Sequence, residues 1–229
     1  MKTIAGGKML EVIALNAHDA LAAAQGGADR IELVGTMDQD GLSATVEQVR
    51  HIREVSDIPI RAMVRDQAGF MPGSKETLAA TARELVQAGV EALVVGWVRD
   101  GQLDTKTLQE VLADVPGCEL TIHRAVDNVA DYAAGWHQIL SLSHVTSVLT
   151  AGSATGVTAG MDNLLSQAVN PQARELMMVG GGLHLEHLPA LRDAGIHKFH
   201  VGSAVRGGSF VNPIDPRLVE SWAVATGVL

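Results

Sequence analysis

The sequence contains a single cysteine, Cys118, among its 229 residues. One cysteine cannot form a disulfide within the chain, which excludes a disulfide-stabilised extracellular fold. The first residues also lack the continuous apolar stretch of a secretory signal, because glycines, a lysine and a glutamate interrupt them. We therefore expect a cytoplasmic protein.

Basic residues and long apolar runs are also scarce. The chain has 17 Lys and Arg against 26 Asp and Glu, a formal net charge of −9, which argues against a broad nucleic-acid-binding surface. No stretch reaches the roughly 18 uncharged apolar residues of a membrane-spanning helix. We expect neither a nucleic-acid nor a membrane partner. A local anion site stays open, since the field in a pocket need not follow the net charge.

Short apolar runs rich in strand-forming residues recur along the chain. They cover residues 9–15, 30–35, 58–64, 91–97, 118–123, 145–150, 175–180 and 198–203. Each run is almost continuously apolar, which is typical of parallel strands that are covered on both faces.

The segments between these runs have helical periodicity and recognisable ends. One is predicted to begin after an Asn16 cap and to end at Gly26–Gly27, and another to run from Ser74 to Gly89. A third ends at Gly195. Helices that alternate with strands in this way indicate an α/β protein with a parallel sheet.

Eight strands alternating with helices predict a single (β/α)8 TIM barrel over residues 1–229. A doubly wound open sheet is the alternative. It is less favoured because no glycine-rich phosphate fingerprint follows the first strand.

Several charged side chains lie on strands or at their carboxyl ends, where barrel proteins place their sites. The candidates are Glu11, Glu32, Arg65, His123, Arg124 and Asp127. Strand residues alternate in direction, and the helix side of these strands is apolar. We therefore expect these charges to face the interior of the barrel.

Each candidate has more than one reading. His123 is predicted to be a general acid or base, with a metal ligand and a hydrogen-bonded core histidine as alternatives. Arg65 and Arg124 suit a carboxylate or phosphate, or else pair with buried acids. Glu11 and Glu32 are either catalytic bases or structural partners of arginines.

Glycines follow the seventh and eighth predicted strands, whose loops often bind phosphate in this fold. We expect Gly181, Gly182, Gly202 and Ser203 to present donors to an anion. The alternative is that these glycines only form tight turns. Arg206, in the second of these loops, is either a further contributor or a solvated side chain.

The order of several phrases resembles the CutC family, which is named for copper homeostasis. "GADRIEL" matches a family phrase, "DGLSAT" is similar to its "GGLTPS", "IHRAVD" to its "FHRAFD", "VLTAG" to its "VLTSG" and "MVGGGL" to its "MAGAGV". The resemblance implies a TIM barrel and a site formed by the six charged candidates. "DQAGF" and "FHVGSAVRGG" depart from the family phrases and indicate a divergent branch.

A specific copper site has little support in the residues themselves. Cu(I) prefers sulfur ligands, and Cys118 begins the fifth strand, at the opposite end from His123. The remaining candidate histidines, His184, His187, His197 and His200, do not form a compact ligand pattern, and the first two are expected to be solvated on a helix. We therefore predict no metal site and no cofactor, with copper implied by the resemblance alone.

Two functions remain. The first is a cofactor-independent lyase or isomerase acting on a small anionic compound, phosphorylated or sugar-derived. Glu32 or Glu11 would be the base, His123 the acid, and Arg65 and Arg124 the anion ligands. The alternative is a copper-binding protein, as the resemblance implies. Whether the chain forms a homo-oligomer stays open.

Overall fold

The computed structural model describes residues 7–39 and 41–229. The first six residues of the expected domain, and Asp40 at the start of "DGLSAT", lie outside the described residues.

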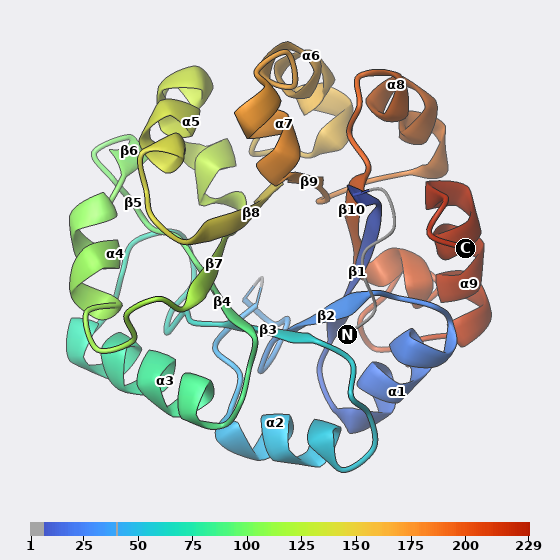
Figure 1. Ribbon diagram of the computed structural model, residues 1–229, viewed down its shortest axis with the longest axis horizontal. Helices are drawn as coiled ribbons and strands as arrows, with labels where there is room; N and C mark the ends of the chain where they lie inside the picture. Colours follow the sequence, from blue (N-terminus) through green and yellow to red (C-terminus); the bar gives the residue numbers. More distant parts are fainter. Residues whose placement is uncertain (1–6, 40) are drawn as a thin grey trace.

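Within these residues, eight parallel strands close into a barrel that helices surround (Figure 1). The strands are β1 (Met9–Ala14), β2 (Arg30–Leu33), β3 (Ile60–Met63), β4 (Ala92–Val95), β7 (Glu119–Ile122), β8 (Val145–Thr150), β9 (Met177–Val179) and β10 (Lys198–Val201). A separate antiparallel pair, β5 (Val98–Arg99) and β6 (Gln102–Leu103), follows β4. The predicted (β/α)8 TIM barrel is confirmed.

The helices lie between successive barrel strands, except α9, which follows the last strand. They are α1 (Ala17–Gln25), α2 (Val46–Arg53), α3 (Lys75–Gln87), α4 (Thr105–Val111), α5 (Tyr132–Leu140), α6 (Val157–Gln167), α7 (Pro171–Leu176), α8 (Leu188–Asp193) and α9 (Pro216–Thr226). Short 3-10 turns are η2 (Arg124–Asn128), η3 (Leu185–His187) and η4 (Ser203–Val205). The predicted caps Asn16 and Ser74 do accept hydrogen bonds from the first turns of α1 and α3.

The seventh strand is shorter than its apolar run suggested. Residues 175–176 complete α7, which Asn170 caps and which has Pro171 in its first turn. This cap and proline favour a helix that extends to Leu176, so β9 begins only at Met177.

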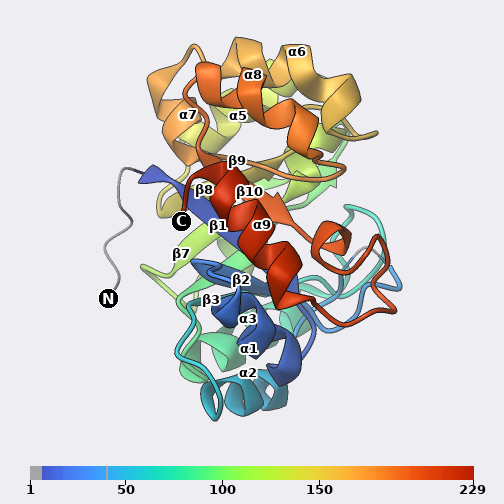
Figure 2. The ribbon, with the colours of Figure 1, turned by 90° about the vertical axis from the view of Figure 1, so that its right-hand side faces the viewer.

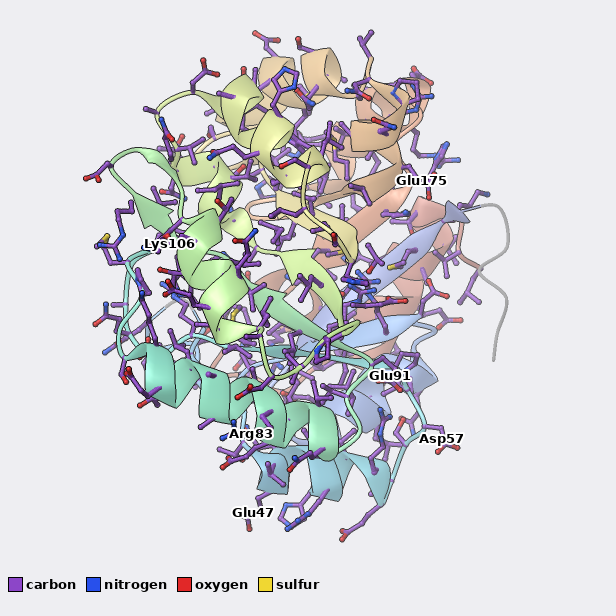
Figure 3. The ribbon with its side chains drawn as sticks, turned by 60° about the vertical axis from the view of Figure 1, so that its left-hand side comes forward. Glu47, Asp57, Arg83, Glu91, Lys106 and Glu175 are labelled. Carbon is purple, nitrogen blue, oxygen red and sulfur yellow. The ribbon has the colours of Figure 1, made fainter. Side chains whose placement is uncertain are left out.

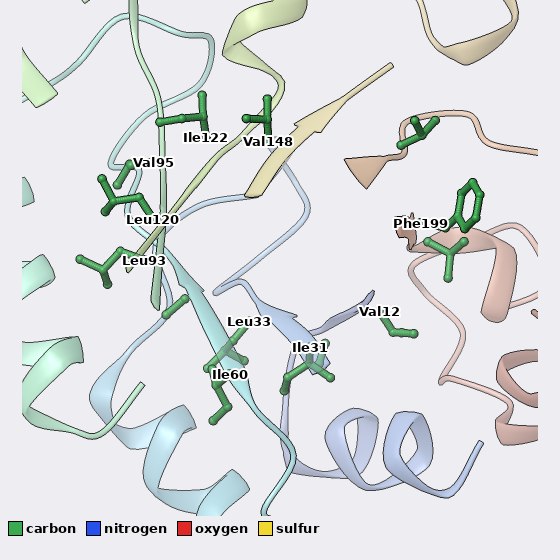
Figure 4. Packing of buried hydrophobic residues seen from close by; sticks show 14 of the residues in the cluster. Val12, Ile31, Leu33, Ile60, Leu93, Val95, Leu120, Ile122, Val148 and Phe199 are labelled. Atoms are coloured by element: carbon green, nitrogen blue, oxygen red, sulfur yellow. The ribbon is translucent and has the colours of Figure 1, made fainter. Parts of the chain in front are cut away.

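Side chains alternate between the helix layer and the barrel interior. In β2, Ile31 and Leu33 belong to the main hydrophobic core, with Ile60 of β3 and Leu93 of β4 (Figure 4). Their neighbours Arg30 and Glu32 are also buried but charged. Because successive strand residues face opposite sides, β2 gives its apolar residues to the helices and its charges to the interior.

The outer surface is charged, and the loops at the carboxyl ends of the strands are extensive. Glu47, Arg83 and Lys106 project from α2, α3 and α4 (Figure 3). The long connection between β10 and α9 projects on one side of the barrel (Figure 2). In the part of the chain that the structure describes, no helix is both long and apolar enough to cross a bilayer.

Candidate functional site

A cavity of about 1200 Å³ opens at the carboxyl ends of the strands. Most of the predicted site residues line it: Glu32, Arg65, His123, Arg124, Gly181, Gly182, Gly202 and Ser203. Glu11 and Asp127 are buried outside this lining. The structure thus brings eight of the ten candidates to one cavity and places the other two behind it.

Glu32 projects from β2 into the cavity and is only 3% exposed. Its Oε2 lies 3.5 Å from His200 Nε2. Its Oε1 is buried and has no hydrogen-bond partner among the described residues. Burial, which penalises the charged form, raises the pKa of Glu32 to about 7. The carboxyl group can therefore gain or lose a proton near neutral pH.

His123 follows β7 and is held as a neutral hydrogen-bond donor. Its Nδ1 accepts the backbone N–H of Ala125 at 3.1 Å, so the ring proton of the neutral form lies on Nε2. Nε2 is buried without a partner in the described part of the chain. Burial and the nearby Arg65 and Arg124 lower the pKa of His123 to about 3. Near neutrality, its Nε2–H can donate to a ligand.

Arg65 lies beyond the end of β3 and is 5% exposed. It donates from Nε to the Gly69 carbonyl at 3.0 Å and from Nη1 to the Gly41 carbonyl at 3.2 Å. The guanidinium also lies 5.4 Å from the centre of the Phe70 ring, which itself lies 5.6 Å from the His123 ring. Loop contacts thus place a fixed positive charge beside His123.

Arg124 is held by the loop that follows β8 and lies against Gly181 in the loop after β9. Its Nε donates to Asp127 at 2.8 Å, and its Nη2 donates to the carbonyls of Ser153 and Ala154 at 2.9 and 3.0 Å. Gly181 permits this placement, because a Cβ there would lie 2.9 Å from the guanidinium. Arg124 therefore contributes a positioned charge to the cavity wall.

Asp127 has a different place from the predicted one. It does not line the cavity, and its oxygens accept from the Thr150 hydroxyl and from the backbone N–H groups of Ala151 and Gly152. With the Arg124 bond, this carboxylate is fully occupied. It organises the loop after β8 and orients Arg124, because the η2 turn directs it back toward β8.

Glu11 is fully buried beneath the cavity. One of its oxygens pairs with Arg30 Nε, and the other lies 2.8 Å from His200 Nδ1. Burial alone would favour the neutral acid, but Arg30 and His200 lower the pKa of Glu11 to about 2. Of its two predicted roles, the structure places Glu11 in the position of an arginine's partner.

His200 is a site residue that the sequence reasoning missed. It lies in β10, is 3% exposed, lines the cavity and is the register partner of Glu11. A strand position with an imidazole among apolar residues was a usable signal, since the same alternation identified Glu11 and Glu32. The prediction grouped His200 with scattered histidines and so overlooked it.

The glycines near the cavity serve different purposes. Gly181 and Gly182 have positive φ values of 88° and 72° and turn the chain after β9. Gly202 has an ordinary φ, but a Cβ there would lie 2.6 Å from Phe210 and 2.8 Å from Ile13. All three bring backbone to the cavity wall, as an anion site would require.

Two predictions about side chains in these loops are wrong. Arg206 is neither a cavity residue nor solvated, because it is 3% exposed and pairs with buried Asp19. His187 is also buried: its Nδ1 accepts the His184 N–H, and its Nε2 lies 3.1 Å from the Thr158 hydroxyl. Each of these side chains bonds to an element that is far away in the sequence, so the neighbouring residues do not reveal its partner.

The described donor groups give a copper ion no thiolate at the cavity. Among residues 7–39 and 41–229, no group of three or more His, Cys, Asp or Glu side chains is placed to hold a metal. Cys118 precedes β7, at the amino end of the barrel, and burial raises the pKa of its thiol. Met177 and Met178 are fully buried in β9. Met37 and Met63 do line the cavity, but the Cys118 thiol does not, so the thiolate that Cu(I) favours is missing from this lining.

Comparison with known proteins gives a consistent family. The CutC family profile matches residues 8–205. A CutC family protein of Xanthomonas axonopodis pv. citri is 31% identical over 199 residues, covering 85% of this chain and 82% of that protein. One from Erwinia tasmaniensis is 27% identical, covering 88% and 81%.

Solved structures show the same fold. One described as a copper homeostasis protein CutC, from Streptococcus agalactiae, superposes with a TM-score of 0.76 at 21% identity, covering 86% of this chain and 98% of that one. Phosphoribosyl anthranilate isomerase from Thermococcus kodakaraensis gives 0.65 at 17% identity, covering 95% and 98%. These identities speak for the barrel alone. With the profile match and the curated relatives, they lead to one conclusion: the chain belongs to the CutC family.

Proposed function

We propose that this protein is an enzyme that removes a proton from carbon next to a carbonyl group in a small anionic compound. The observation that carries the proposal is a pair of buried polar atoms that lack partners among the described residues and belong to residues lining one cavity, Glu32 Oε1 and His123 Nε2. Leaving buried polar groups unpaired costs about 1–3 kcal/mol each. A ligand that bonds to both would recover that cost.

The two groups suit complementary halves of a proton transfer. Glu32 takes the proton onto Oε1, and the electron pair of the broken C–H bond moves onto the carbonyl oxygen. The Nε2–H of neutral His123 donates to that oxygen as negative charge develops on it. A carboxyl group with a pKa of about 7 matches the operating pH. A neutral imidazole with a pKa of about 3 serves here as a hydrogen-bond donor, not as an imidazolium acid.

The rest of the cavity suits an anionic substrate. Arg65 and Arg124 supply fixed positive charge on the His123 side, and guanidinium groups bind carboxylates and phosphates well. Gly182 and Ser203 bring backbone from the loops after β9 and β10 to the same cavity. These features support a phosphorylated or sugar-derived carbonyl compound and lyase or isomerase chemistry without an organic cofactor.

Copper handling is the second candidate, because a structural relative is described as a copper homeostasis protein. The positions of the described donors favour the first proposal, since Cys118 and the cavity lie at opposite ends of the barrel.

Hydrogen exchange in D₂O tests the proposed chemistry. Purified protein is incubated with a panel of phosphorylated sugars and small keto acids, and proton NMR follows the loss of each C–H signal next to the carbonyl. We expect exchange with one structural class and its loss in Glu32→Gln. Exchange that persists in Glu32→Gln, or a wild type that binds no anionic compound at millimolar concentration, would contradict the proposal.

A further inference from the structure

His200 lies between two buried glutamates that come from neighbouring strands. Its Nδ1 is 2.8 Å from Glu11 Oε1, and its Nε2 is 3.5 Å from Glu32 Oε2. All three side chains are almost completely buried. The imidazole therefore connects the carboxylate beneath the cavity to the one inside it.

The Glu11 end of this connection is fixed. Arg30 pairs with the second Glu11 oxygen and also donates to the Ser147 hydroxyl at 3.1 Å. Arg30 and His200 hold the pKa of Glu11 near 2, so Glu11 is ionised at neutral pH. Since an ionised carboxylate only accepts hydrogen bonds, His200 Nδ1 must carry a proton.

The Glu32 end is loose. A separation of 3.5 Å exceeds the usual 2.7–3.2 Å of an N–H···O hydrogen bond. Two arrangements of equal net charge exist: a proton on His200 Nε2 beside a Glu32 carboxylate, or a proton on Glu32 beside a bare Nε2. Arg30 of β2 and Arg61 of β3 are the other charged groups that act on the two glutamates.

We propose that His200 is a positioning residue that shares one proton with Glu32, while Glu11 and Arg30 hold the imidazole in place. When the shared proton is on His200, Glu32 is an anion facing the cavity and can accept a proton from a ligand. When it is on Glu32, the carboxyl group can only return one. The use of this pair in catalysis rests on the proposed function, but the proton sharing itself needs no substrate.

The wild-type protein provides the first test, through ¹⁵N NMR of labelled histidine between about pH 5 and pH 9, around the ordinary histidine pKa of about 6.5. Comparison with His200→Gln assigns the signals. We expect His200 Nδ1 to stay protonated throughout, while Nε2 changes over the same pH range as the Glu32 carboxyl carbon. An unprotonated Nδ1, or an Nε2 that titrates independently of Glu32, would overturn the proposal.

The second test measures the Glu32 titration by ¹³C NMR of labelled glutamate carboxyl groups in His200→Phe, which keeps a ring but cannot hold the proton. We expect the Glu32 midpoint to rise by about one pH unit, a tenfold change in proton affinity, because the imidazolium no longer favours the carboxylate. His187→Gln is the matched control, since it removes another buried histidine that does not line the cavity.

An unchanged Glu32 midpoint in His200→Phe would also overturn the proposal. If that variant does not fold, the wild-type ¹⁵N experiment decides alone. Neither measurement uses a substrate, so a shifted Glu32 together with no C–H exchange would contradict the proposed function and leave proton sharing intact. C–H exchange together with an unshifted Glu32 midpoint would contradict proton sharing only.

Discussion

Glu11 and Glu32 lie on adjacent strands of one barrel, and both are almost fully buried, yet their proton affinities move in opposite directions. Arg30 and His200 hold the pKa of Glu11 near 2, whereas burial raises that of Glu32 to about 7. The difference lies in their partners, because Glu32 faces the cavity with one oxygen unpaired. Burial alone therefore does not tell a structural carboxylate from a reactive one.

The same contrast separates the two histidines at the cavity. His200 has a carboxylate near each ring nitrogen, and burial is outweighed so that its pKa is raised. His123 faces arginines and a backbone N–H, and its pKa falls to about 3. One imidazole is suited to holding a proton and the other to donating a hydrogen bond while neutral.

The largest expected effect comes from removing the charge on Glu11. Glu11→Gln leaves Arg30 buried without its carboxylate, and breaking a buried ion pair in this way costs about 3–5 kcal/mol. Glu32→Gln removes a group without a charged arginine partner of its own, so we expect a change within about 1 kcal/mol. Urea unfolding at neutral pH measures both. Equal losses of stability in the two variants would contradict the distinction.

The next effect concerns the pH dependence of the free energy of unfolding, which His123 and Glu32 should change in opposite directions. Folded His123 releases its proton near pH 3 but unfolded His123 near 6.5, so it makes the protein more stable as the pH rises between these values. Glu32 keeps its proton up to about pH 7 in the folded protein but only up to pH 4.5 in the unfolded chain. Its contribution to stability therefore falls as the pH rises from 4.5 to 7. Between pH 4.5 and 6.5 the two oppose each other.

Variants should separate these slopes. In Glu32→Gln only the His123 slope remains, and we expect stability to rise between pH 4.5 and 6.5 relative to wild type. In His123→Gln it should fall relative to wild type. Each slope approaches about 1.4 kcal/mol per pH unit for one proton. In urea unfolding, parallel curves for the two variants would show that neither pKa is shifted, and a variant that follows the wild-type curve would show that the group it removes titrates normally.

Anion binding should depend on the loop after β9. Gly181→Ala places a Cβ 2.9 Å from the Arg124 guanidinium, and Gly182→Leu inserts a bulky side chain at the cavity wall. We expect each to weaken sulfate binding about tenfold, or about 1.4 kcal/mol, by calorimetry. Gly89→Ala is the control, because it has a φ of 91° but open space around the new Cβ. Wild-type affinity in both cavity variants would make these glycines turn residues only.

The smallest effect is expected on Cu(I) binding when the single thiol, Cys118, is removed. Cys118 lies at the far end of the barrel from the cavity, so Cys118→Ser should change Cu(I) binding less than twofold, and both proteins should lose copper to a competing chelator. A one-to-one complex that resists the chelator and survives Cys118→Ser would reveal a histidine and methionine site.

The barrel was predictable because strands covered on both faces produce continuous apolar runs, and because Asn16 and Ser74 cap their helices locally. Alternation along the strands was enough to place Glu32 inside. The partners of the buried charged side chains were harder to predict, because a residue such as Arg206 pairs with Asp19, which is far away in the sequence. His200 could have been found by the same alternation, but its importance depends on the closure of β10 against β1.

The most direct test of the account is the pH at which Glu32 titrates in the unliganded wild-type protein. Glutamate labelled with ¹³C at the carboxyl carbon gives the signal, and its absence in Glu32→Gln identifies it. We expect a midpoint near pH 7, because the carboxyl group is buried and one of its oxygens has no partner among the described residues. A midpoint near the ordinary 4.5 would mean that Glu32 is already stabilised as an anion, and it would contradict its role as the base.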